Sequence, residues 1–143
     1  MIQVKKILYP TDFSSYSNQA YFHALGMAET YRAGLIVAHV CNSANPGDNG
    51  YWRDQLEQVR PVNPKIVVSH VLLQGDPATE IIRYASDAGI DAIVIGTHGR
   101  TGTDRHEMGS VAEKVMREAP CSVLVVKLPR GVSAPIRPHA ARV

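Results

Sequence analysis

The sequence lacks the features that mark membrane-spanning or secreted chains. Its apolar runs stay well short of the roughly 18 to 20 residues that a membrane helix needs. The opening residues, MIQVKKILYP, contain no long apolar segment with a cleavage site, so a secretory signal is not expected. Only two cysteines occur, Cys41 and Cys121, and no redox or metal-binding motif surrounds them. We therefore expect a cytoplasmic protein with reduced thiols and no disulfide.

A large excess of charge of one sign is also absent, because 15 Lys and Arg residues face 13 Asp and Glu residues. The balance of +2 comes from residues 127–143, which carry four basic residues and no acidic one. The rest of the chain has a slight acidic excess, which argues against a nucleic-acid-binding face. Residues 128–143 are rich in Pro and Arg without apolar periodicity, so we expect a disordered tail after one domain spanning 1–127.

Short apolar runs alternate along the chain with segments of helical periodicity. The expected strands are 4–10, 35–40, 66–75, 91–96 and 121–127. The expected helices are 14–33, 51–60, 77–89 and 110–119. This alternation predicts an α/β fold with a single doubly wound, five-stranded parallel sheet in the order 3-2-1-4-5 and helices on both faces.

Three helix ends can be predicted from their residues. Gly34 is expected just after the first helix, in the left-handed conformation that glycine adopts easily. Asp76 is expected to cap the third helix, with Pro77 at its first position. Ser110 and Glu113 have the S-x-x-E spacing of a capping box at the start of the fourth.

Two loops leave the sheet where a ligand is expected. Ligands of doubly wound sheets bind beyond the carboxyl ends of the strands, where the strand order reverses. In the predicted order, PTDFS (10–14) and GTHGRTGTDRHEMGS (96–110) flank that point. The second loop holds four glycines, but no Lys follows its last glycine and no G-x-G pair occurs in it. It is therefore neither a Walker loop nor a Rossmann turn.

The glycine-rich loop still favours an anion. Glycines let a ligand's phosphates approach the backbone, and a helix N-terminus offers N–H donors and a positive dipole end. Ser110 is consistent with this role and equally with a simple helix cap. Arg100 could donate to phosphate oxygens or be a solvated loop residue, and His98 could contact a phosphate or be an ordinary loop histidine.

The spacing of these residues resembles a known signature. Gly96, Gly99 and the pair Gly109-Ser110 match G-x2-G-x9-G-[S/T], the nucleotide-binding signature of the universal stress protein family. ILYPTDFS, VAHV, QGDP, IGTHGRTG, GSVAEKV and PCSVLVV also resemble family segments in the same order, so the resemblance covers residues 4–127. It implies a homodimeric α/β protein of the ATP-binding subclass.

The resemblance also implies roles for individual residues. The backbone around Gly96, Gly99, Gly109 and Ser110 would hold the phosphates, helped by the Ser110 hydroxyl. Asp12 would face the ribose or a nucleotide-bound Mg²⁺, although an Asx-turn or capping role in TDFS is the alternative. Val40 would offer backbone hydrogen bonds to the adenine, with Pro10 and Ile95 as apolar contacts. The remaining expected contacts are Thr11, His98, Arg100 and Val111.

Two departures from the family pattern affect this interpretation. The spacer RTGTDRHEM (100–108) is charged where the family is often apolar, so the loop is either more solvated or meets a different partner. Asp104, His106 and Glu107 are not favoured as a metal site, because ligands at nearly adjacent positions rarely converge. The short connection between the second and third strands leaves the adenine side more open.

No catalytic constellation is evident, neither Ser-His-Asp, nor Cys-His, nor a carboxylate pair arranged for phosphoryl transfer. We expect a nucleotide-dependent regulatory module of the stress response that pairs through the edge strand 121–127 and acts on an unknown protein partner. The alternatives are a low-turnover ATPase or phosphotransferase, and a structural dimer that binds no nucleotide. His39 is expected in the core, and Tyr51 and Trp52 are expected to cover the sheet or to stack on a base.

Overall fold

The computed structural model describes residues 3–42, 48–61, 63–97 and 109–127. Five strands and four helices alternate in this part of the chain. In order they are β1 (Lys6–Pro10), α1 (Ser15–Tyr31), β2 (Gly34–Cys41), α2 (Asp48–Glu57), β3 (Val68–Gln74), α3 (Pro77–Asp87), β4 (Ala92–Gly96), α4 (Ser110–Glu118) and β5 (Ser122–Val126). The predicted alternation is confirmed, with boundaries shifted by a few residues at most. The predicted tail, 128–143, lies outside the described residues.

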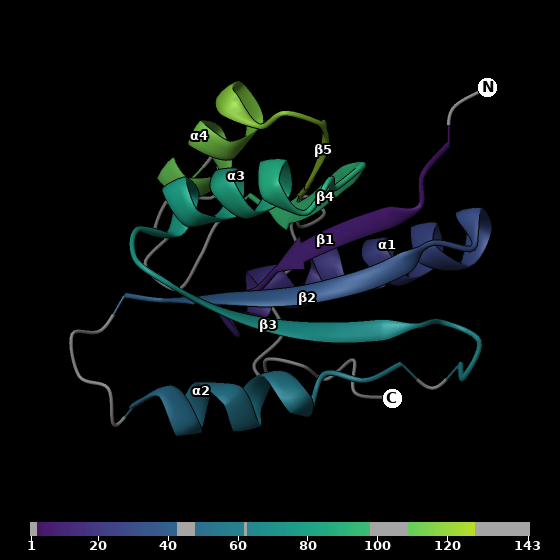
Figure 1. Ribbon diagram of the computed structural model, residues 1–143, viewed down its shortest axis with the longest axis horizontal. Helices are drawn as coiled ribbons and strands as arrows, with labels where there is room; N and C mark the ends of the chain where they lie inside the picture. The colour runs from purple at the N-terminus through teal and green to yellow at the C-terminus, as the bar shows by residue number, and fades with distance from the viewer. Residues whose placement is uncertain (1–2, 43–47, 62, 98–108, 128–143) are drawn as a thin grey trace.

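The strands form one parallel sheet in the order β3-β2-β1-β4-β5, as predicted. Figure 1 shows α1 and α2 on one face of this sheet and α3 and α4 on the other. Because helices cover both faces, every residue of β4 is buried, and so is every residue of β1 after Lys6. This two-sided burial explains why the strands read as continuous apolar runs in the sequence.

Each face of the sheet has its own apolar core. On one face, α1 turns the small side chains Ala20, Ala24 and Ala28 toward the sheet, which lets the helix approach closely. On the other face, the buried side chains of α3 and α4 include Ile81, Ala85, Ala112 and Val115. Leu25 of α1 and Ile82 of α3 are only partly buried beside these cores.

The end of α1 and the start of α3 test two of the three predicted helix ends. Asp76 caps α3 as expected, since its carboxylate accepts the Thr79 N–H at 3.0 Å, with Pro77 at the first turn. The prediction for Gly34 is wrong. Arg32 takes the left-handed conformation after α1, with φ of 54°, and Gly34 is already the first residue of β2. The Gly34 N–H bonds to the Lys5 carbonyl, so strand pairing with β1 begins there.

The two cysteines lie far apart in the sheet. Cys41 ends β2 and is buried, whereas Cys121 precedes β5 and is half-buried, with β1 and β4 between those strands. Burial raises the pKa of the Cys121 thiol, with a smaller contribution from the nearby Asp91 carboxylate. Within the described ranges, none of the helices has the length and apolar character that crossing a membrane requires.

Two glycines give a matched test of backbone strain. Gly75, between β3 and α3, has φ of +134°, and a Cβ there would lie 3.0 Å from the Glu80 Cγ. Gly26, inside α1, has open space around it. We expect Gly75→Ala to lower the free energy of unfolding by about 1–3 kcal/mol and Gly26→Ala to raise it by about 0.5–1 kcal/mol. Urea unfolding curves of both variants check this, and equal effects of the same sign would contradict it.

Candidate functional site

The strands end at different points along the carboxyl edge of the sheet, and we call the place beyond the end of β1, between β2 and β4, the gap. Pro10, the last residue of β1, pairs with Ala38 of β2. The neighbouring strand β2 continues to Cys41, and β4, on the other side of β1, continues to Gly96. The strand order reverses at this point, because β1 runs between the halves β3-β2 and β4-β5. The gap is therefore the switch point at which doubly wound sheets bind ligands.

Backbone groups line both sides of this gap. The Ala38 carbonyl accepts the Thr11 N–H at 2.8 Å, so alternate residues of β2, including Val40, direct their N–H and C=O toward β1. On the other side, the Thr97 N–H bonds to the Val126 carbonyl at 3.0 Å, so Gly96 directs its groups away from β5 and back toward β1. Since β1 has ended, Val40 and Gly96 face the gap itself.

The apolar residues predicted around the ligand meet on one side of the gap. Val40 and Ile95 belong to the same buried cluster as Ala112 of α4. Pro10 follows Leu8 of that cluster by two positions, and the alternation of β1 puts both on the face covered by α3 and α4. Pro10, Val40 and Ile95 thus come from three adjacent strands and share one face, as their predicted common role requires.

The hydroxyl and the carbonyl of Thr11 both accept hydrogen bonds from within the protein. Its hydroxyl accepts the Phe13 N–H at 3.0 Å and the Ser17 hydroxyl at 2.8 Å, while its carbonyl accepts the His39 Nδ1–H at 2.8 Å. The side chain is only 4% exposed. Thr11 therefore fixes the loop that follows β1. The residue of this loop whose side chain remains as a candidate ligand contact is its neighbour, Asp12.

That neighbour, Asp12, makes an Asx turn. Its Oδ1 accepts the Ser14 N–H at 2.9 Å, and Ser14 in turn caps α1 by accepting the Ser17 N–H at 3.1 Å. The structural alternative considered for Asp12 is therefore observed. A carboxylate has about four acceptor positions on its two oxygens, so this turn is compatible with a second role at the carboxyl end of β1.

A buried network of hydrogen bonds supports the loop between β1 and α1. The Tyr9 hydroxyl donates to the Ser17 carbonyl at 2.9 Å and lies 2.9 Å from the Ser17 hydroxyl, which bonds to Thr11. Burial is the main cause that raises the pKa of the Tyr9 phenol, so it stays neutral and keeps its donor. These bonds connect β1, the loop and the first turn of α1.

The start of α4 differs from its prediction. Gly109, rather than Ser110, is the N-cap, and no side chain caps the helix among the described residues. The predicted capping box is wrong, because Ser110 already lies in the helix and the Glu113 N–H bonds to the Gly109 carbonyl at 3.0 Å. The Gly109 N–H bonds to the Thr97 carbonyl at 2.6 Å and fixes the helix start beside the end of β4. Within the described part of the chain, the first-turn N–H groups, including those of Ser110 and Val111, therefore have no side-chain cap.

The model of the Universal stress protein family matches residues 3–127, which is most of the chain. This chain belongs to the universal stress protein family. A curated relative, universal stress protein MJ0531 of Methanocaldococcus jannaschii, is 34% identical over 143 residues, covering 88% of this chain and 84% of the relative.

Solved structures agree with the universal stress protein fold. The structure of protein MJ0577 superimposes with a TM-score of 0.72 at 29% identity, covering 91% of this chain and all of that one. A universal stress protein from Archaeoglobus fulgidus, solved in complex with dAMP, gives a TM-score of 0.69. It is 22% identical, over 89% of this chain and 100% of its own, so it supports the fold alone.

Part of the family signature lies outside the described residues. His98, Gly99 and Arg100 belong to this part, as does the charged spacer with Asp104, His106 and Glu107. The described ends of the loop, Gly96 and Gly109-Ser110, are brought together by the bond between Gly109 and Thr97. In the described part of the chain, no group of three or more His, Cys, Asp or Glu side chains could hold a metal ion.

The sequence did not predict two contacts between elements of this protein. Phe13 has a positive φ of 65° and packs against Trp52 of α2, which places α2 next to the loop. Lys114 of α4 donates to the Thr79 hydroxyl at 3.1 Å, beside Asp76. Hydrogen bonds from Thr79 lower the pKa of Asp76, with Lys114 adding to this effect. Both features depend on packing between elements, so no local sequence signal marks them.

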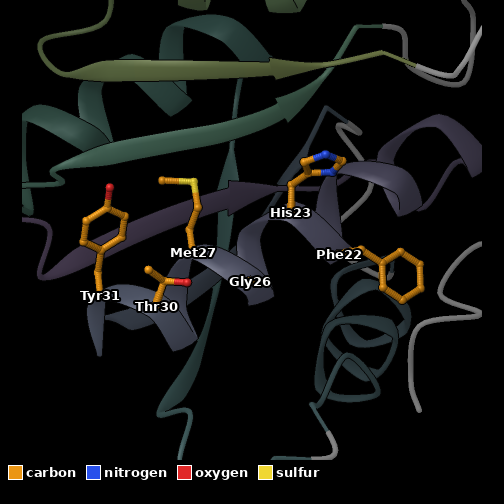
Figure 2. Close-up of a pocket in the computed structure, with 6 residues that line it drawn as sticks. All are labelled: Phe22, His23, Gly26, Met27, Thr30 and Tyr31. Carbon is orange, nitrogen blue, oxygen red and sulfur yellow. The ribbon is translucent and has the colours of Figure 1, made fainter.

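A separate surface depression lies on α1, away from the switch point. Its volume is about 460 Å³ and it is lined by Phe22, His23, Gly26, Met27, Thr30 and Tyr31. Figure 2 shows these side chains along the outer part of the helix. The lining is mostly apolar and holds no carboxylate or strong cation, so it does not resemble a phosphate site.

Proposed function

We propose that this universal stress protein is a cytoplasmic, ATP-binding regulatory module, in which nucleotide occupancy changes the favoured partner or dimer state. The observation that carries the proposal is the gap beyond β1, bounded by the backbone groups of Val40 and Gly96 and by the first turn of α4, which no described side chain caps. Backbone donors and acceptors of this kind suit a base edge on one side and phosphates on the other. The dAMP bound to the Archaeoglobus relative is consistent with such a ligand.

The residues present fit an adenine nucleotide. Val40 would bond to the adenine edge through its backbone, with Pro10 and Ile95 against the ring. Asp12 would meet the ribose hydroxyls or a Mg²⁺ ion carried by the phosphates. The phosphates would bind the backbone and hydroxyl groups at the start of α4. The residues proposed for this last role are Gly96, Gly109, Ser110 and Val111, with His98, Gly99 and Arg100 from the loop between them.

The hydrogen bonds of the described side chains fit a regulatory function better than a catalytic one. Buried Thr11 and the N-cap residue Ser14 hold their hydroxyl oxygens in internal hydrogen bonds, and no described hydrogen bond joins either hydroxyl to a basic side chain. His39 bonds to a backbone carbonyl through Nδ1 in the core. Asp12 alone could place a metal ion, which keeps a low-turnover ATPase or phosphotransferase as the alternative. Single-turnover hydrolysis with Mg²⁺, compared between the native protein and Asp12→Ala, separates the two functions.

Mass spectrometry of the nucleotide released from freshly purified protein tests the proposal. We expect an adenine nucleotide in the released fraction, and calorimetric titration with ATP and Mg²⁺ is expected to give saturable binding. Titration with ADP, AMP and dAMP under the same conditions measures how much the outer phosphates contribute. Absence of binding at millimolar ATP would overturn the proposal and would favour a structural dimer that binds no nucleotide.

We also propose that two copies pair through β5. This strand lies at one edge of the sheet, and Leu124 in its middle is 40% exposed. Met116 of α4 adds a second exposed apolar side chain. An exposed apolar edge strand is a liability that antiparallel pairing across a two-fold axis removes. A nucleotide-dependent change at the end of β4 would reach the interface directly, because β4 pairs with β5 along its whole length.

A further inference from the structure

The loop between β1 and α1 contains a strained residue. Phe13 has φ of 65°, in the left-handed region that bulky side chains rarely occupy. Its ring is buried, with 7% exposed. Strained backbone of this kind persists only where surrounding contacts impose it, and it gathers at functional sites.

Rings from two other elements clamp the Phe13 side chain. The Trp52 ring of α2 stacks on it at 5.4 Å between centroids, with only 9° between the planes. The His39 ring of β2 lies 4.7 Å away and also contacts Trp52 at 4.6 Å. The Phe13 N–H is held as well, because it donates to the Thr11 hydroxyl. Packing of α2 and β2 thus opposes relaxation of the backbone at Phe13.

This strain acts on the proposed ligand contact next to it. Asp12 and Ser14 flank Phe13, and the Asp12 carboxylate accepts the Ser14 N–H at 2.9 Å. The chain must turn sharply at Phe13 for this bond to close, so the conformation of Phe13 determines where the carboxylate points. If the ring lost its support, the backbone could move to negative φ and carry Asp12 away from the end of β1.

We propose that Phe13 is a positioning residue: clamped by Trp52 and His39, it holds the Asp12 carboxylate at the nucleotide site and couples that site to α2. The binding part of this inference rests on the proposed function. Coupling is reciprocal, so a partner that displaces Trp52 weakens nucleotide binding, and a nucleotide that engages Asp12 strengthens the contact with α2. On α2 the exposed Tyr51 contacts Trp52 edge-on, next to this clamp.

Hydrogen exchange at the Ser14 amide tests the positioning without any nucleotide. We expect Phe13→Gly to speed this exchange by about tenfold or more, because glycine accepts φ of 65° without strain but provides no ring to hold it there. Phe22→Ala is the matched control, since Phe22 is the only other phenylalanine and is 46% exposed on α1. Trp52→Leu, which removes the clamp and leaves Phe13 in place, should act in the same direction and serves if Phe13→Gly fails to fold. Unchanged Ser14 exchange in the folded variants would overturn the proposal.

A double-mutant cycle with ATP tests whether Phe13 acts through Asp12. Phe13→Gly is expected to weaken ATP binding about tenfold in the native background and to have no further effect on Asp12→Ala. Equal losses in both backgrounds would mean a general structural role and would contradict the proposal. If the native protein binds no ATP, the proposed function fails, whereas Ser14 exchange still decides the positioning role.

Trp52 offers a spectroscopic test of the coupling to α2. It is the only tryptophan of the chain, so its emission reports the contact with Phe13 without labelling. ATP is expected to change this emission in the native protein and to leave it unchanged in Asp12→Ala at saturating nucleotide. Saturating ATP without any change in the native protein would contradict the coupling.

Discussion

Ser110→Asp is expected to weaken ATP binding by about 100-fold or more while making the free protein slightly more stable. Ser110 is exposed at the first position of α4, where none of the described side chains caps the helix. At an effective dielectric constant of about 20, two unit charges about 4 Å apart repel each other by about 4 kcal/mol. Even half of this repulsion exceeds the 1.4 kcal/mol that corresponds to tenfold in affinity. The same carboxylate interacts favourably with the helix dipole, by about 0.3–1 kcal/mol.

The opposite signs of the two effects make this substitution informative. A variant that merely damaged the fold would lose stability and affinity together. Ser110→Asn is the matched control, because it has nearly the size of aspartate without the charge, and it should retain most of the affinity. Calorimetry with ATP measures binding, and urea unfolding measures stability. If Ser110→Asp bound ATP as tightly as the native protein, the phosphates would have to lie elsewhere.

The fold could be predicted from the sequence because its signals are local and repeated. Strands buried on both faces read as apolar runs, and α3 has both an aspartate cap and a proline at its first turn. The family resemblance reinforced this prediction. The ends of the helices were harder to predict than the elements themselves. Arg32, not a glycine, takes the left-handed position after α1, because pairing of Gly34 with β1 determines where the chain must turn.

The start of α4 shows why a motif can mislead by one residue. S-x-x-E predicts Ser110 as the cap, but the Gly109 N–H is held by the Thr97 carbonyl at the end of β4. This tertiary bond fixes Gly109 as the cap and carries Ser110 into the helix. The error favours the proposed function, since a serine used as a cap would have occupied one of the N–H groups offered to the phosphates.

The features of the candidate site that depend on strand order could be predicted from the sequence. The features that depend on side-chain packing between elements could not. Pro10, Val40 and Ile95 share one face near the carboxyl ends of three adjacent strands, an arrangement that the strand order determines. His39 is buried with a hydrogen-bond partner, as expected for a core histidine. The positive φ of Phe13 depends on rings from α2 and β2, which are distant in sequence, so neither periodicity nor spacing could reveal it.

Val123→Pro is expected to convert a dimer into a monomer and to leave the protomer folded. The Val126 carbonyl bonds to β4, so Ser122, Leu124 and Val126 direct their backbone groups inward, whereas Val123 and Val125 direct theirs to the open edge. Proline at position 123 therefore removes a donor that β4 does not use and that a second copy could bond, and proline is tolerated on the solvent side of edge strands. We expect the dissociation constant of the dimer to rise by about 100-fold, equivalent to about 2.7 kcal/mol.

Leu124→Pro provides the contrast that distinguishes edge pairing from general damage. Its N–H points toward β4, so proline there removes a bond within the protomer and should lower the unfolding temperature as well as dimer formation. Sedimentation equilibrium at micromolar concentration measures the association of both variants, and thermal unfolding measures the protomer. A native protein that is monomeric, or a Val123→Pro variant that remains dimeric, would exclude β5 as the interface. In that event a nucleotide signal arriving at β4 would have no direct route to a second copy, and the contact between Phe13 and Trp52 would remain as the link from the site to α2.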